Sequence, residues 1–341
     1  MNTNISQSYT TAGMFTLSLR LVVGWTYFSA FWRRLILANK LDPETAGYIG
    51  EKFNHFLPNA LGIKPIILHL VENPDSLWWA MASFTIIEGI VGLLIMLGLF
   101  TRLMSLGVFG LAMGILLGSG WIGTTCLDEW QIGVLGIATG FTLFLTGSGK
   151  YSLDHYFMQK ESPFTKKTMF KWLGSGPLPL AEKLVSRVTL FGAVGILGLT
   201  LFTNQYFHGG VWGTLHNKSV KPKIEISNAH INNETLSFEV FRVEGVDVYG
   251  SFLIGIDVVN QNKTSVFSLK GDDLAQFNTK MVNNKYVAKV KPGAHSLIIP
   301  LGSRAELTLG DIELDRATTD RYTLVLTDIS GITWEQDIVI D

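Results

Sequence analysis

Five long apolar runs in the first 207 residues restrict the fold of this chain more than any other feature. They cover residues 14–37, 77–100, 103–120, 131–147 and 188–207. Each run is roughly 20 residues long, which is the length that an α-helix needs to cross the hydrocarbon core of a bilayer. Because a backbone in lipid must satisfy its own hydrogen bonds, we expect five transmembrane helices.

The basic residues between these runs predict how the helices are oriented. The 148–187 segment is rich in Lys and Arg, whereas the 38–76 loop has more acidic than basic residues. The loop between the third and fourth runs has neither Lys nor Arg. The positive-inside rule therefore predicts a multi-pass protein of the cytoplasmic (inner) membrane, with its amino terminus inside. Everything after residue 207 is then outside, in the periplasm or the extracellular space.

From about residue 222 the sequence changes to an alternation of apolar and polar residues. Stretches such as TLSFEVFRV and RYTLVLTDI have this period of two, and turn-rich segments separate them. Several short strands of this kind are typical of an antiparallel β-sandwich, and we expect an immunoglobulin-like one. The predicted fold is therefore a membrane α-helical bundle followed by an all-β sandwich.

The composition excludes several classes of function and cofactor. A net charge of −1 gives no reason to expect a nucleic-acid partner. The single cysteine excludes a disulfide framework, a thiol-ligated Fe–S cluster and a CxxC redox pair within one chain. No haem, flavin or nucleotide motif is found, and His208 with His216 is a weak pair for a metal. We therefore expect no metal, haem, flavin or Fe–S site.

Glu88 lies at the middle of the second apolar run, where an ionisable group costs a few kcal/mol. It should face the bundle interior, either as a structural ion pair or neutral carboxyl, or as a proton or ligand site. A stripe with helical spacing in the first run should face the same interior. The stripe consists of Arg20, Gly24, Tyr27, Phe31 and Arg34. Arg20 is expected to reach Glu88.

Charged and aromatic residues gather at the outer ends of the predicted helices. Arg33 and Arg34 are there either as snorkelling side chains or as a site for an anion arriving from outside. Trp121 and Trp130 suit a membrane interface and would also suit a flat quinone ring. Trp212 and His216 lie just beyond the fifth run.

Cys126, the only thiol, lies in the predicted outer loop GWIGTTCLDEWQIG. It is either an inert buried cysteine or a reactive one. The reactive alternative is considered because free thiols outside the cytoplasm are generally avoided. Asp128 and Glu129 would oppose a thiolate, whereas a nearby arginine would favour it.

These stretches resemble a known enzyme family. GWTYFSAFWRR, the Glu88 run leading into GLFTR, and GWIGTTCLDEWQIG are similar to the membrane-embedded DoxD subunit of thiosulfate:quinone oxidoreductase, within the wider DoxX-like group. This resemblance covers about residues 10–160. The fifth run, GGVWGTLHNKSVKP and the sandwich resemble the small DoxA subunit from about residue 180. The expected domains are a DoxD-like four-helix domain (1–160), a cytoplasmic basic linker (161–187), a fifth transmembrane helix (188–207) and an extracytoplasmic DoxA-like sandwich (208–341).

The resemblance implies oxidation of thiosulfate to tetrathionate, with a membrane quinone as electron acceptor. The expected partners are thiosulfate, a quinone and the lipid bilayer, and a homo-oligomer is left open. We assign Cys126 and Glu88 as candidate catalytic residues. The candidate substrate-binding residues are Arg20, Tyr27, Arg33, Arg34, Trp121, Asp128, Trp130, Trp212 and His216.

Two other functions remain open at this point. The chain would be a non-catalytic membrane anchor for a redox complex, or a transporter for sulfur oxyanions that uses the arginines and Glu88. Five spans without an evident inverted repeat disfavour a carrier.

Overall fold

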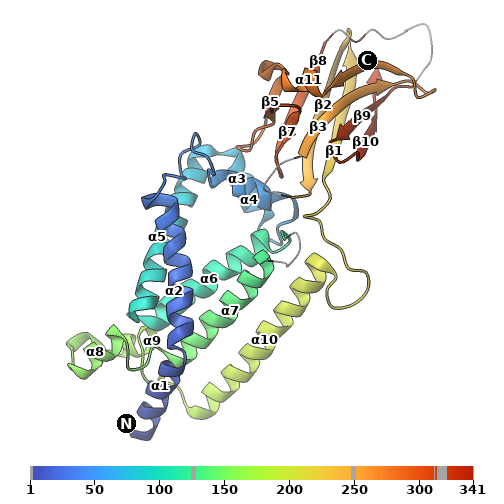
Figure 1. The fold of residues 1–341 in the computed structure, drawn as a ribbon. Helices are drawn as coiled ribbons and strands as arrows, with labels where there is room; N and C mark the ends of the chain where they lie inside the picture. Colours follow the sequence, from blue (N-terminus) through green and yellow to red (C-terminus); the bar gives the residue numbers. More distant parts are fainter. Residues whose placement is uncertain (1–2, 124–127, 247–250, 311, 313–320, 341) are drawn as a thin grey trace. The chain divides into compact units, whose positions relative to one another are not determined.

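The predicted order of a helical part followed by a β part is confirmed in a computed structural model (Figure 1). The structure describes residues 3–123, 128–246, 251–310, 312 and 321–340. The chain forms two compact units. The first comprises residues 1–48, 78–120 and 127–216, and the second comprises residues 49–77, 121–126 and 217–341.

Long helices make up the first unit. They are α1 (Thr3–Phe15), α2 (Leu17–Phe31), α5 (Pro74–Leu97), α6 (Thr101–Ser119), α7 (Asp128–Thr146) and α10 (Glu182–His208). Among the described helices, α5, α6 and α10 are each long and apolar enough to cross a membrane. Residues 5–15 and 17–36, which meet at a bend of 53°, add a fourth crossing if they count as one span. α7 coincides with the predicted span 131–147 but is outside this set, and its first turn is polar.

Glycines allow these helices to approach one another closely. A Cβ on Gly92 of α5 would lie 2.4 Å from the backbone nitrogen of Phe28 in α2. A Cβ on Gly140 of α7 would lie 2.8 Å from the backbone nitrogen of Phe109 in α6. Small residues at such contacts are typical of helix packing in membranes. α10 differs, because its only buried side chains are those of Thr203, Phe207 and His208, near its carboxyl end.

The basic segment after α7 forms three short helices, α8 (Leu153–Gln159), η3 (Pro163–Lys166) and α9 (Thr168–Leu173). They close one end of the bundle around two buried charges. Arg102 donates to the carbonyls of Phe144, Lys171 and Gly176 at 2.9, 2.9 and 2.5 Å. Asp154 accepts hydrogen bonds from the backbone of Phe100, the backbone and hydroxyl of Thr101, and the hydroxyl of Ser175. Every nitrogen of the Arg102 guanidinium and both oxygens of the Asp154 carboxylate make hydrogen bonds, so we interpret Arg102 as structural.

The second unit is built on two β-sheets. Its strands are β1 (Lys223–Asn232), β2 (Thr235–Glu244), β3 (Ser251–Val259), β4 (Ser265–Lys270), β5 (Val282–Asn284), β6 (Lys291–Pro292), β7 (Leu297–Ile299), β8 (Arg304–Leu309), β9 (Thr323–Asp328), β10 (Thr333–Asp337) and β11 (Val339–Ile340). One sheet has the order β11-β1-β2-β8-β5, and the other has the order β10-β9-β3-β7-β6, with β4 also paired to β3. The described pairs are antiparallel except β1 with β11, which is parallel.

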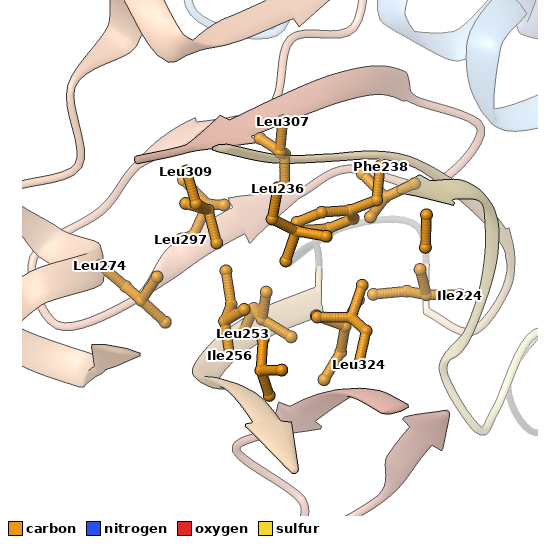
Figure 2. Packing of buried hydrophobic residues seen from close by; sticks show 14 of the residues in the cluster. Ile224, Leu236, Phe238, Leu253, Ile256, Leu274, Leu297, Leu307, Leu309 and Leu324 are labelled. Carbon is orange, nitrogen blue, oxygen red and sulfur yellow. The ribbon is translucent and has the colours of Figure 1, made fainter. Parts of the chain in front are cut away.

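The sandwich core explains the period of two in the sequence. Along β2, β8 and β9, buried residues alternate with partly exposed ones. Figure 2 shows side chains such as Leu236, Leu253 and Leu324 meeting in this core, where none of the three is exposed. Burying each such leucine contributes about 1.5–3 kcal/mol.

Most of the loop between the first two membrane runs, residues 49–76, belongs to this second unit. It forms α3 (Gly50–Phe56), η2 (Leu57–Asn59) and α4 (Lys64–Glu72). Leu57, Ile67 and Val71 form a buried cluster with Tyr286 of the sandwich. Asn54, which is also buried, donates to the Gly302 carbonyl at 3.0 Å and accepts from the Ala288 backbone at 3.0 Å. The loop and the sandwich are therefore one packed body.

Gly302→Ala is expected to destabilise this body by about 2–4 kcal/mol, from overpacking and from a left-handed backbone. Gly302 has a φ of 73°, and a Cβ there would lie 1.8 Å from the Asn54 carbonyl oxygen. The measurement is thermal unfolding of the full chain in detergent. Gly310→Ala is the matched control, because its Cβ meets nothing within 4 Å. Equal unfolding temperatures for the two variants would contradict the packing described here.

Candidate functional site

A buried ion pair joins α2 and α5 inside the first unit. Glu88 on α5 is 2% exposed, and its carboxylate accepts a hydrogen bond from the Arg34 guanidinium. The prediction that Glu88 faces the bundle interior and has a partner is confirmed. The partner is Arg34, whose side chain is 30% exposed, so one end of the pair is buried and the other reaches the edge of the bundle.

The two neighbouring arginines lie in a local widening of the helix and have different surroundings. Residues Trp32–Ile36 form a π-helical turn, η1, directly after α2. π-Turns are rare and are frequent at functional sites. Arg33 is exposed and its Nε donates to the Ser29 carbonyl at 3.2 Å, whereas Arg34 turns inward to Glu88. Only one of the two guanidinium groups is therefore bound to the buried carboxylate.

Two polar side chains lie on the interior faces of the same helices. Tyr27 is buried on α2, and its hydroxyl lies 3.3 Å from the position that a Cβ on Gly136 of α7 would take. Thr85, one helical turn before Glu88, is buried, and its hydroxyl has no hydrogen-bond partner among the described residues. The sequence stripe on α2 is thus confirmed as an interior face. Thr85 was not singled out from the sequence, although its spacing of three from Glu88 places both residues on one face of the helix.

Arg20 does not reach Glu88, so that expectation was wrong. Its guanidinium donates to the carbonyls of Ser148 and Tyr151 at 2.6 and 2.5 Å. Arg20 and Arg34 are fourteen residues apart, which corresponds to about 21 Å along a helix at 1.5 Å per residue. Arg20 therefore belongs to the end of the bundle that holds Arg102 and Asp154, away from the Glu88 pair.

The two candidate tryptophans beside the cysteine loop have different surroundings. Trp121 is buried in the second unit, where its indole donates to the Phe56 carbonyl at 3.3 Å. Trp130 at the start of α7 donates to the Thr203 hydroxyl at 3.0 Å and meets the His208 ring edge-on, with centroids 6.5 Å apart. His208 is buried, and its Nε2 lies 2.9 Å from the Gly120 carbonyl oxygen.

Trp212 and His216 lie on an exposed loop after α10. The Trp212 side chain is 68% exposed, and the Gln205 side chain holds its backbone nitrogen and oxygen at 3.0 and 3.1 Å. His216 is also exposed, with its Nδ1 3.4 Å from the Thr214 carbonyl oxygen. Neither side chain contacts Glu88 or Arg34 in the described part of the first unit, so the structure does not bring these predicted residues together.

Cys126 and the side chain of Asp128 lie outside the described residues. The segment that leads to Cys126 is described, and its last residue, Gly123, is held on both backbone groups. Its N–H donates to the Ser219 hydroxyl at 3.0 Å, and its carbonyl accepts from Ser219 at 2.5 Å and from Asn217 at 2.6 Å. Both residues lie in the stretch GGVWGTLHNKSVKP, which carries the DoxA resemblance, but neither of them was singled out from the sequence.

No group of three His, Cys, Asp or Glu side chains that could hold a metal ion occurs in the described parts of the chain. The side chains of the Glu88 pair can themselves supply two kinds of chemistry, which are proton transfer by a buried carboxyl and anion binding by arginine.

Comparison with protein families gives two matches that follow one another along the chain. Residues 15–181 match the family of the thiosulfate:quinone oxidoreductase (TQO) small subunit DoxD. Residues 207–337 match the family of the TQO small subunit DoxA. The first match contains the Glu88 pair and the cysteine loop, and the second contains Asn217, Ser219 and the sandwich. All of α10 except its last two residues lies between them. The chain therefore belongs to the DoxD and DoxA families and joins both subunit types of thiosulfate:quinone oxidoreductase in one polypeptide.

Proposed function

We propose that this chain oxidises thiosulfate to tetrathionate and transfers the two electrons to a membrane quinone. The observation that carries the proposal is the presence of both TQO subunit types in one chain. The buried Arg34–Glu88 pair supports it, because it places a proton-carrying group and an anion-binding group in contact inside a membrane bundle.

The atoms and electrons of the proposed reaction balance without a resident cofactor. The Cys126 thiolate and the outer sulfur of one thiosulfate form a sulfur–sulfur bond, while a quinone takes the two electrons released and two protons. A second thiosulfate then attacks the sulfur that carries the sulfonate group. This attack releases tetrathionate and regenerates the thiolate, by the logic of thiol–disulfide exchange.

Glu88 is proposed to supply protons to the reduced quinone, since a carboxyl in hydrocarbon is stable when neutral or paired. Arg34 is proposed to alternate between Glu88 and the incoming dianion. When Glu88 is protonated, Arg34 loses its partner and is available to a sulfur oxyanion. Exposed Arg33 would attract the same dianion. Tyr27 and Thr85 are proposed to contact the quinone or a water beside Glu88.

The remaining sequence candidates have weaker support as substrate contacts. Arg20, which is bound to the carbonyls of Ser148 and Tyr151, is proposed to stabilise the bundle instead of binding substrate. Trp121 and Trp130 are proposed to have structural roles, since each indole is fixed by a hydrogen bond. For exposed Trp212 we propose an interfacial position.

The test is an assay with purified protein, thiosulfate and a short-chain quinone. We expect quinol to appear in a one-to-one ratio with tetrathionate, with the two products followed by absorbance and by ion chromatography. Thiosulfate uptake into proteoliposomes without quinol would instead indicate a transporter. If the assay shows no quinol formation and no uptake, the chain is instead a membrane anchor for another redox protein.

A further inference from the structure

Two hollows in the first unit share the side chain of Tyr9. A cavity of about 200 Å³ is lined by α1, α8 and residues 175–176, and a groove of about 490 Å³ is lined by α1, α7 and α10. Figure 1 shows α1, α8 and the first turns of α10 at the same end of this unit. The positive-inside rule predicts that this end faces the cytoplasm.

The groove is largely apolar, although three threonines line it. The hydroxyls of Thr142, Thr146 and Thr189 each donate to the carbonyl four residues earlier, at 2.9, 3.1 and 2.9 Å. Their donors are therefore satisfied within their own helices, and Phe141 and Leu145 add hydrocarbon surface. α10 borders the groove with its amino-terminal half, whereas its buried side chains lie near its carboxyl end. Such a groove suits a hydrocarbon chain that enters from the bilayer.

The cavity, in contrast, is lined by polar side chains with unused hydrogen-bond donors. The side chains of Ser6, His155 and Gln159 line it and make no hydrogen bond with the described part of the chain. No acidic residue is among its described lining residues. Burial and the nearby Lys150 lower the pKa of His155, so its ring is an uncharged donor at neutral pH. The cavity can therefore donate several hydrogen bonds to an anion.

Positive charge exceeds negative charge around this cavity. The buried charged side chains at this end of the described bundle are Arg20, Arg102 and Asp154. Arg102 donates to the carbonyl of Gly176, which lines the cavity, and its guanidinium carbon lies 6.0 Å from the centre of the Tyr9 ring. On the sequence, residues 148–187 carry seven Lys and Arg against three Asp and Glu. An anion in the cavity would therefore lie in a favourable electrostatic field.

We propose that the two hollows form a binding site for one anionic phospholipid of the cytoplasmic leaflet, with its phosphate in the cavity and an acyl chain in the groove. Basic pockets between transmembrane helices on the cytoplasmic side bind lipid head groups of this kind. A soluble anion would use the cavity alone, whereas Tyr9 joins the polar hollow to an apolar one. The bound lipid would fill the space between α10 and the rest of the bundle. Its test does not depend on thiosulfate or quinone.

The test is native mass spectrometry of the full chain, delipidated in detergent and titrated with phosphatidylglycerol or with phosphatidylcholine of the same acyl chains. We expect one phosphatidylglycerol to bind at least about tenfold more tightly than phosphatidylcholine, because basic groups favour a head group with a net negative charge. Phosphatidylglycerol should also raise the temperature of thermal unfolding more than phosphatidylcholine does. Equal affinities for the two lipids would overturn the proposal.

A matched pair of variants on α10 tests the position of the acyl chain. Ala193→Trp places a large ring in the groove and should weaken phosphatidylglycerol binding at least about tenfold, because the chain loses several buried methylene contacts. Val194→Trp adds the same ring at the next residue, which is 58% exposed and is not among the residues that line the groove. Its affinity should stay within about twofold of the native value. Equal affinities in the two variants would contradict the placement of the chain in the groove.

The double variant His155→Phe with Gln159→Leu tests the head-group cavity. It removes two donors and leaves the groove intact, so the preference for phosphatidylglycerol should fall below about threefold. Neither side chain is buried or makes a described hydrogen bond, so this variant keeps the proposal testable if Ala193→Trp does not fold. An unchanged preference would overturn the head-group assignment. Displacement of the lipid by an equal concentration of glycerol phosphate, the soluble part of the head group, would assign the cavity to a free anion and overturn the lipid site.

Discussion

Cys126→Ala is expected to lower thiosulfate-dependent quinone reduction by at least about a hundredfold, because removal of a nucleophile removes the covalent route altogether. Cys126 is the only thiol in the chain, so no neighbouring cysteine can replace it. The measurement is quinol formation by the purified variant, at thiosulfate concentrations up to saturation. We expect the loss to appear in kcat.

A second measurement makes this prediction more specific. If the intermediate forms, native protein incubated with thiosulfate and quinone should gain the mass of one bound thiosulfate sulfur–sulfonate group on Cys126. A thiol reductant should remove that mass. Full activity in Cys126→Ala would exclude the covalent route and leave direct reaction between thiosulfate and quinone, held by the arginines.

The elements that the sequence predicts well are those whose signal is local. Apolar runs of about 20 residues predict α5 and α6, because a helix satisfies its own backbone hydrogen bonds in lipid. The alternation in TLSFEVFRV predicts β2 because one face of a sheet is buried and the other is not. The sequence also predicts that Glu88 faces the interior, because an ionised side chain that faces lipid costs free energy.

The details that the sequence did not reveal depend on contacts between distant residues. Arg20 and Arg34 lie on one face of the first helix, and spacing alone could not decide which of them pairs with Glu88. The π-turn at Trp32–Ile36, which contains Arg34, has no signature in hydrophobic periodicity. The bond between Asn54 and Gly302 joins positions 248 residues apart, so the loop could not be assigned to the sandwich from its composition.

The buried pair itself gives the other large expected effect. Arg34→Met leaves the Glu88 carboxyl buried without a partner, and loss of one member of a buried pair typically costs about 3–5 kcal/mol. Glu88→Gln should cost less, because the Arg34 side chain is 30% exposed and can turn to water or headgroups. The measurement is the free energy of unfolding in detergent. Arg33→Met, on the exposed neighbour, is the control for stability and should cost less than about 1 kcal/mol.

The activities of the same variants distinguish a proton carrier from a structural ion pair. As a general acid, Glu88 should contribute about 10²–10⁴-fold to turnover, so Glu88→Gln should lose that factor while remaining folded. The double variant Arg34→Met with Glu88→Gln leaves no buried charge at this pair and should recover most of the stability that Arg34→Met loses. The double variant should nevertheless stay as inactive as Glu88→Gln. Removing both charges restores stability, but it does not restore the carboxyl that carries the proton. Normal turnover in Glu88→Gln would assign the pair to the fold alone, and protons would then have to reach the quinone by another path.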